Sequence, residues 1–139
     1  MFLRELRTEI EIAASPDEVW NVFADFESYP DWTGIFSFPG GHLETGNKLE
    51  VIITPTDSRS ITFRPVLLRA DEKREFRWKG HLLLPGVFDG EHYFRIEGIE
   101  GGRARFMHGE IFTGLLVPWL WRDLDTRTRR GFERFNRDL

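Results

Sequence analysis

The side chains best suited to acid–base chemistry are His92, His108 and Glu110, which lie on two strand-like segments either side of Gly101-Gly102. If this glycine pair forms a hairpin turn with Gly101 at its tip, residues whose numbers sum to about 202 face each other. The predicted pairs are His92 with Glu110, Phe94 with His108, and Ile96 with Phe106. Because side chains alternate along a strand, all six share one face.

The opposite face of the same hairpin is richer in charge. It carries Glu91, Tyr93, Arg95, Arg105, Met107 and Ile111. We therefore expect this second face to contact solvent and the first face to contact the core, because charged groups are costly to bury. A slip of one residue at the turn would exchange the two faces.

The predicted pair of His92 and Glu110 has several chemical interpretations. A buried carboxylate is costly unless it is paired, and a cross-strand histidine would offset much of that cost. The pair could be a purely structural hydrogen bond, could orient a ligand hydroxyl or carbonyl, or could transfer a proton, since histidine titrates near neutrality. With His108 the pair also has the residue types of a metal site. Such sites need three or four organised ligands, so we predict no metal and no other cofactor.

The elements that position these side chains begin with an alternating strand, in which Leu6, Thr8, Ile10 and Ile12 share one face. Ser15, Pro16 and Glu18 then form a helix start with a capping box. A second short helical piece spans residues 26–32. Between residues 35 and 112, short strands alternate with glycine-rich and proline-rich turns, which predicts an antiparallel meander.

The C-terminal part has a helical period. Its apolar stripe consists of Leu116, Leu120, Leu124, Thr128, Phe132, Phe135 and Leu139. We expect Gly131 in this helix to allow close approach of a neighbouring strand, because glycine there otherwise costs about 1 kcal/mol relative to alanine. The predicted fold class is α+β. A long helix packs on about seven strands only if the sheet curves around it, which leaves a gap between them.

Aromatic and aliphatic residues are predicted to line this gap. The expected apolar walls are Trp32, Phe63, Phe76, Trp78, Phe94, Phe112, Leu120, Leu124 and Phe132. Trp32 has two interpretations, an anchor that closes one end of the barrel or a lid over the mouth. Trp119 and Trp121 cannot both face inward, because neighbours on a helix lie about 100° apart.

Composition limits the function classes. The 139 residues contain no cysteine and 14% aromatic residues, and their formal net charge is −4. These values fit a single aromatic-rich domain over residues 1–139 and argue against a thiol nucleophile, a disulfide framework and a nucleic-acid partner. No apolar run is long enough for a membrane span, and the first residues do not resemble a signal peptide, so a cytoplasmic location is expected.

Several segments resemble the SRPBCC superfamily, the START-like or birch-pollen-allergen-like helix-grip fold. The resemblance is carried by residues 12–20, 26–32, 76–80, 85–92, 110–116 and 128–132, so it extends over essentially the whole chain. It implies a curved antiparallel sheet around a long C-terminal helix, with two short helices after the first strand, as in bacterial stand-alone members of polyketide cyclase/dehydrase type. The superfamily includes lipid carriers, hormone receptors, cyclases and co-chaperones, so the fold leaves the reaction open.

Three functions follow as hypotheses. The first is binding of a small hydrophobic or aromatic ligand, with His92, His108 and Glu110 as the polar groups that orient it. The second is a cofactor-independent cyclase, dehydratase or lyase in which Glu110 or His92 moves a proton. The third is a protein-interaction module whose core is filled by its own side chains. The chain is expected to be a monomer or a homodimer, the latter through an exposed tryptophan or an edge strand.

Overall fold

The computed structural model describes residues 2–41, 45–46, 48–54, 59–71, 74–82 and 84–139. Its strands are β1 (Leu3–Ile12), β2 (Phe36–Gly41), β3 (Leu49–Ile53), β4 (Ile61–Phe63), β5 (Val66–Asp71), β6 (Glu75–Leu82), β7 (Phe88–Ile99) and β8 (Arg103–Thr113). Its helical segments are α1 (Pro16–Phe23), the 3₁₀ helices η1 (Phe26–Asp31) and η2 (Glu100–Gly102), α2 (Val117–Asp123), the π-helical turn η3 (Leu124–Thr128) and α3 (Arg129–Asp138).

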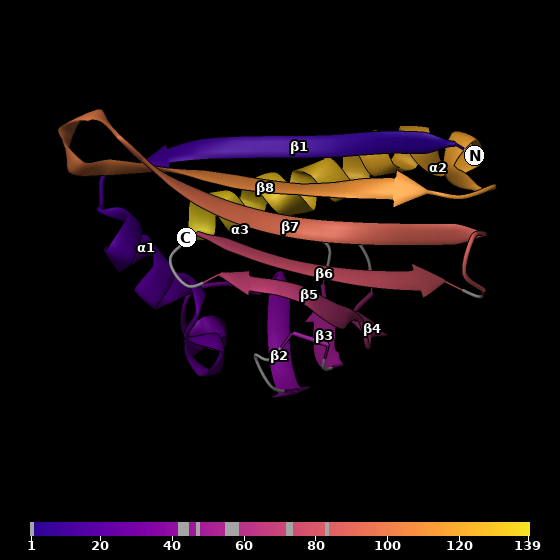
Figure 1. Cartoon of the computed structure of the whole chain (residues 1–139), viewed down its shortest axis with the longest axis horizontal. Coiled ribbons are helices and arrows are strands. Elements are labelled where there is room, and N and C mark those ends of the chain that lie inside the picture. The colour runs from indigo at the N-terminus through magenta and orange to yellow at the C-terminus, as the bar shows by residue number, and fades with distance from the viewer. Residues whose placement is uncertain (1, 42–44, 47, 55–58, 72–73, 83) are drawn as a thin grey trace.

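The strands form a five-stranded antiparallel sheet in the order β1-β8-β7-β6-β5 and a three-stranded sheet in the order β2-β3-β4. The C-terminal helix lies across the large sheet, and β2, β3 and β4 extend below it (Figure 1). This is the predicted α+β helix-grip architecture. The predicted strand through residues 61–69 is divided into β4 and β5 around Pro65, whose ring removes a backbone donor.

The hairpin register is confirmed. His92 lies opposite Glu110, Phe94 opposite His108, and Ile96 opposite Phe106. Gly101 and Gly102 both adopt positive φ, which explains why glycine occupies this turn. The predicted inward face is correct, because His92, His108 and the three apolar partners are all buried.

The prediction of a wholly solvated outer face is wrong at two positions, because Tyr93 and Met107 are buried. The Tyr93 hydroxyl donates to Glu5 Oε2 at 2.5 Å, and the Arg77 guanidinium lies 5.0 Å from the centre of the tyrosine ring. Arg7 Nη2 lies 3.2 Å from Met107 Sδ. The long arginine side chains therefore cover these residues on a face that no helix packs against.

The capping box at the start of α1 is confirmed. Ser15 Oγ accepts from the Glu18 backbone N–H, and Glu18 Oε1 accepts from the Ser15 N–H. This cap directs α1 so that Val19, Trp20 and Phe23 are buried. The Phe23 ring then contacts those of Phe76, Phe94 and Phe106, and the helix closes one end of the core.

The C-terminal helix is interrupted by the π-helical turn η3. A π turn takes up about one extra residue, so the helix on its N-terminal side is rotated relative to a regular α-helix. Phe132 and Phe135 of the predicted apolar stripe are buried. Near the start of the helix, however, the buried residue is Val117, whereas Leu116 and Leu120 of the predicted stripe are exposed. Leu120 is 36% exposed, so its assignment to the core stripe is wrong.

Candidate functional site

Five side chains from four elements form one continuous line of polar contacts through the core, in which four are joined by hydrogen bonds and Glu110 lies at ion-pair distance from His92. We call this set the relay: Glu110, His92, His108, Asn136 and Thr8. β7 and β8 supply the histidines and the glutamate from their inward face, while α3 and β1 supply Asn136 and Thr8. His92 and His108 are 1% and 0% exposed. The hairpin register alone brings His92 and Glu110 together, and packing of the helix on the sheet adds the rest.

The contacts within the relay are short. His92 Nδ1 lies 3.2 Å from Glu110 Oε1, and His92 Nε2 lies 2.7 Å from His108 Nε2. His108 Nδ1 lies 3.0 Å from Asn136 Oδ1. Asn136 Nδ2 donates to Thr8 Oγ1 at 2.8 Å, and the Thr8 hydroxyl donates to the His108 carbonyl at 2.7 Å.

The direction of every hydrogen bond in the relay follows from the bond between the Thr8 hydroxyl and the His108 carbonyl. A carbonyl oxygen only accepts, so the single Thr8 hydroxyl proton is committed to His108 O, and Asn136 must present its NH₂ group to Thr8. The Asn136 oxygen then faces His108 Nδ1, which must carry a proton. A neutral His108 accepts at Nε2, so His92 donates from Nε2 and a neutral His92 accepts at Nδ1.

Glu110 must therefore supply the proton between itself and His92. Burial raises the pKa of Glu110 to about 8 and lowers the pKa of His92 to about 3, which agrees with a protonated carboxyl beside a neutral imidazole. Burial also lowers the pKa of His108, the nearby His92 lowers it further, and hydrogen bonds to Asn136 and to the Phe132 backbone offset part of the effect.

Glu110 is the end of the relay that reaches solvent, since its side chain is 18% exposed. Its carboxyl lies against the backbone of Gly90 on the neighbouring strand. A Cβ atom built on Gly90 would overlap Glu110 Oε2. Among the described residues, Oε1 contacts His92, whereas no hydrogen-bond partner is found for Oε2. The absence of a side chain at Gly90 thus allows the carboxyl to lie beside His92.

Aromatic rings enclose the two histidines. Phe132 from α3 stacks on His108 with ring centres 4.0 Å apart and planes 15° apart. Phe94 lies 4.5 Å from His108 and 4.8 Å from His92, and Trp78 lies 4.8 Å from His92. This environment explains why both imidazoles remain neutral, because an apolar surrounding disfavours the charged form.

The predicted apolar wall residues separate into groups. Phe76, Trp78 and Phe94 belong to a large buried cluster with the rings of α1 and η1, while Phe112, Phe132 and Leu124 belong to a smaller cluster at the α2 end. Glu110 lies opposite Leu6 of this smaller cluster on β1 and two residues before Phe112 on β8. Trp121 is half-buried against the smaller cluster and Trp119 is 84% exposed, so one tryptophan faces inward, as expected.

Other predicted wall residues lie apart from the relay. Leu120 is partly exposed on α2. Phe63 is on β4, opposite Val51 in the small sheet. Trp32 ends η1 and packs on Tyr29 and Phe135, and no partner for its buried indole N–H is found in the described part of the chain. These contacts match the interpretation of Trp32 as an anchor.

Sequence reasoning did not identify Thr8 and Asn136 as site residues. Thr8 had a detectable signal, because it is the polar residue in the otherwise apolar series Leu6, Thr8, Ile10 and Ile12. Asn136 lies four residues after Phe132 and so shares its helix face, but asparagine on an amphipathic helix is usually exposed. Its partnership with His108 depends on a contact between residues 28 positions apart.

The expectation that Gly131 allows close approach of a strand is wrong. A Cβ atom built on Gly131 would meet no heavy atom within 4 Å, although the residue is buried. Open space therefore lies beside α3, one residue before Phe132 and one turn before Phe135.

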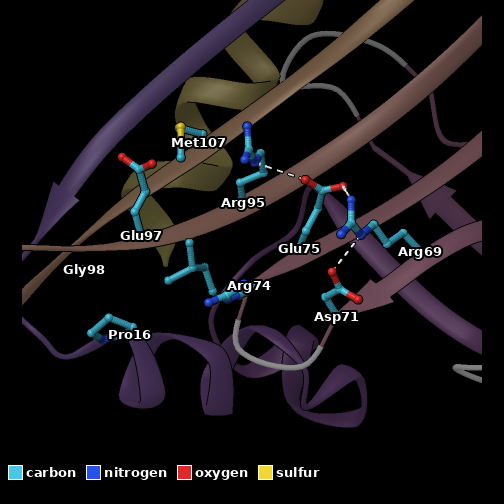
Figure 2. A pocket seen from close by; sticks show the side chains of 10 residues that line it. Pro16, Arg69, Asp71, Arg74, Glu75, Arg95, Glu97, Gly98 and Met107 are labelled. Carbon is cyan, nitrogen blue, oxygen red and sulfur yellow. Dashed lines mark hydrogen bonds and ion pairs between the residues drawn. The ribbon is translucent and has the colours of Figure 1, made fainter.

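A separate pocket of about 460 Å³ lies on the outer face of the large sheet, near the start of α1 (Figure 2). Most of its charged lining is paired: Arg95 Nε lies 3.0 Å from Glu75 Oε1, and Arg69 Nε lies 2.7 Å from Asp71 Oδ2. Arg74 is the lining charge for which no ion pair is found among the described residues.

Neither a metal site nor a membrane-spanning helix is found among the described residues. Within the described residues, no group of three or more histidine, aspartate or glutamate side chains is arranged to hold a metal ion. In the relay, the two histidines face each other through their Nε2 atoms rather than converging on a point. None of the helices that the structure describes is long and apolar enough to cross a membrane.

Comparisons with known proteins agree on the family and the fold. The family model for polyketide cyclase / dehydrase and lipid transport matches residues 4–139. The chain is similar to the Zhui aromatase/cyclase from Streptomyces, with 16% identity, 99% of this chain and 91% of that chain covered, and a TM-score of 0.73. It is also similar to protein Ms6760 from Mycobacterium smegmatis, with 14% identity, 99% of this chain and 93% of that chain covered, and a TM-score of 0.75. Its similarity to Ara h 8.0201 has 12% identity, covers 97% of this chain and 96% of that chain, and gives a TM-score of 0.65. No curated protein sequence matches the chain.

Proposed function

Because the chain belongs to the polyketide cyclase / dehydrase and lipid transport family, we propose that it binds a small hydrophobic or aromatic ligand between the large sheet and the C-terminal helix. The ligand would contact the relay at Glu110 and the apolar side chains of the smaller cluster. The similar solved structures share less than 25% sequence identity with this chain, so they support its fold alone. Ligand binding is inferred from the side chains of the relay and of the smaller cluster.

The observation that carries the proposal is a polar relay that is internally satisfied except at its solvent end. Burying polar groups is costly, and a core of the same volume could be built from apolar residues at no loss of stability. Here the buried line ends on the partly exposed side chain of Glu110, while Phe132 stacks on His108 farther along it. Apolar walls with a few convergent polar groups and perturbed pKa values are typical of small-molecule sites.

Three nearby side chains support an apolar contact surface at this end. Phe88, Trp121 and Leu124 are partly buried and pack against the smaller cluster, so each still presents part of its surface. Trp121 lies about three helical turns before Phe132 and therefore shares its helix face, Leu124 belongs to the π turn between them, and the open space at Gly131 lies beside the same helix. π turns are frequently found at functional sites.

Native mass spectrometry tests the proposal directly. Freshly purified protein should carry a reproducible extra mass that is lost on denaturation, and the spectrum also reads whether the chain is a monomer or a homodimer. Leu124→Arg should lose that mass, whereas Leu115→Arg, at a position 64% exposed outside the cluster, should keep it. Equal retention by both folded variants, or a clean apo mass together with no binding of added aromatic ligands, would contradict ligand binding here.

A second candidate is proton-transfer catalysis of the cyclase or dehydratase type. The observation that favours it is the 3.2 Å contact between Glu110 Oε1 and His92 Nδ1, because a carboxyl whose pKa burial raises to about 8 can act as a general acid at neutral pH. Glu110→Gln should then bind a polyketide-like substrate but fail to convert it. Normal turnover by this variant would refute the role.

The third candidate is an interaction module with a filled core. Its support is the larger cluster, in which Phe23, Phe36, Phe94 and Phe135 make close ring contacts. The relay end, with the exposed carboxyl and the open space at Gly131, lies outside that packing. A cytoplasmic location remains part of the proposal, to be tested by fractionation of the source cells.

A further inference from the structure

The hydrogen-bond directions of the relay point to a ligand class. We propose that the site selects a neutral apolar molecule bearing a hydroxyl or N–H group, which donates a hydrogen bond to Glu110 Oε2. This inference depends on the proposed ligand binding and specifies which chemistry is bound.

The first step is that Glu110 faces the ligand as an acceptor. The Thr8 hydroxyl bond to the His108 carbonyl sets the orientation of Asn136 and, through it, the protonation of both imidazoles. Because burial keeps both imidazoles neutral, the arrangement without two facing lone pairs places the carboxyl proton on the 3.2 Å contact between Glu110 Oε1 and His92 Nδ1. Glu110 Oε2 is then a carbonyl-type oxygen with lone pairs and no proton.

The second step is that Oε2 is available. The carboxyl is positioned over Gly90, and a hydrogen-bond partner for Oε2 is missing among the residues that the structure describes. An acceptor at a partly exposed position beside apolar rings gains a hydrogen bond from a ligand donor, whereas a ligand acceptor at the same place would oppose it.

The third step is that the interior offers nothing to an anion. The buried polar or charged side chains of the described residues are Thr8, Thr33, Glu75, His92, His108 and Asn136, and they include no lysine or arginine. Among the described residues, the titratable side chain in contact with Glu110 is His92 from β7, and burial keeps it neutral, while Arg4 on β1 is exposed to solvent. A carboxylate or phosphate ligand would therefore lose its hydration without gaining a counter-charge.

The relay directions can be measured without any ligand. Long-range ¹H–¹⁵N correlation spectra of the wild-type protein at pH 6.5 should show His92 protonated at Nε2 and His108 protonated at Nδ1. A proton on His92 Nδ1 would make Glu110 Oε1 an acceptor and leave Oε2 as the oxygen that carries the carboxyl proton, so Oε2 would donate to the ligand and the inference would be overturned whatever the protein binds.

Ligand selection is tested by calorimetry with three matched probes at pH 6.5. 2-Naphthol donates a hydrogen bond, 2-methoxynaphthalene only accepts, and 2-naphthoate is an anion. We expect 2-naphthol to bind at least about ten-fold more tightly than either of the others, as one hydrogen bond to a buried acceptor predicts. Glu110→Gln should preserve the preference, because its amide can donate to His92 and accept from the ligand.

Two glycine variants on β7 form a matched pair. Gly90→Ala places a methyl group where Glu110 Oε2 lies, so the carboxyl must move and the preference for 2-naphthol should fall to near unity. In Gly98→Ala the new methyl would lie 3.5 Å from Pro16 Cγ, an ordinary contact, and the preference should persist. Equal affinity of wild-type protein for all three probes would overturn only the inference. No binding of any probe, together with a clean apo mass, would overturn the proposed function as well.

Discussion

The proton on Glu110 makes the stability of this protein depend on pH in a way that one substitution should remove. Burial raises the pKa of Glu110 from 4.5 to about 8 on folding, so the folded state retains a proton that the unfolded chain releases. Stability falls with rising pH wherever the folded state binds more protons. The stabilisation is complete below pH 4.5 and is lost as pH rises toward 8. Glu110→Gln retains a donor to His92 and has no proton to lose.

The magnitude follows from the pKa values. Between pH 6.5 and 8 the folded His92 and His108 are neutral, and Glu110 has the shifted pKa nearest to this interval. The unfolded chain still releases part of its histidine protons just above pH 6.5, which offsets part of the Glu110 effect. A one-proton difference corresponds to about 1.4 kcal/mol per pH unit. Since the titration flattens near pH 8, the side chain is 18% exposed and the histidines offset part of the effect, the net wild-type loss over this interval should be about 0.5–1 kcal/mol.

Below pH 6.5 the stability should depend on pH in the opposite direction, which gives a second test. Burial lowers the pKa values of His92 and His108, so the unfolded chain takes up protons below pH 6.5 that the folded state does not, and stability falls as pH falls. In the wild type, Glu110 offsets one of these two protons between pH 4.5 and 6.5. Without it, the slope in Glu110→Gln should be about twice that of the wild type.

Urea unfolding followed by tryptophan fluorescence at pH 5.5, 6.5 and 8 measures both signatures. Glu133→Gln is the control, because Glu133 is an exposed carboxylate on α3 and its variant should follow the wild-type profile. Parallel profiles for Glu110→Gln and the wild type from pH 6.5 to 8 would refute the reasoning, since Glu110 would then be ionised in the folded protein.

Three further predictions concern stability at pH 6.5, measured by the same urea titrations. Asn136→Leu should destabilise the fold by about 2–4 kcal/mol because it removes the partners of His108 Nδ1–H and Thr8 Oγ1, and a loss below about 1 kcal/mol would show that the relay is not structurally coupled. Gly131→Ala should stabilise the helix by about 1 kcal/mol, because its methyl group meets open space, and a destabilised variant would contradict that opening. Ser15→Ala should cost about 1 kcal/mol through loss of the α1 cap, and an unchanged midpoint would show that the cap is dispensable.

The sequence by itself determined the parts of this protein that depend on local rules. The alternation of side chains and the Gly101-Gly102 turn were sufficient to predict the pairs His92–Glu110 and Phe94–His108 and the face they share. The capping residues Ser15 and Glu18 predicted the start of α1 for the same reason. A strand face and a helix cap involve neighbours in sequence or a single turn, so a short pattern contains the necessary information.

Only the tertiary structure decided which further groups meet this face and how protons are arranged on it. Asn136 reaches His108 because α3 packs across β8, and Thr8 completes the line because β1 pairs with β8. Tyr93 is buried because its ring occupies the space left by the missing side chain of Gly109 on β8 and lies beneath the guanidinium of Arg77 from β6. These outcomes depend on contacts between distant segments and on competition for buried volume, which the period of a single segment does not encode.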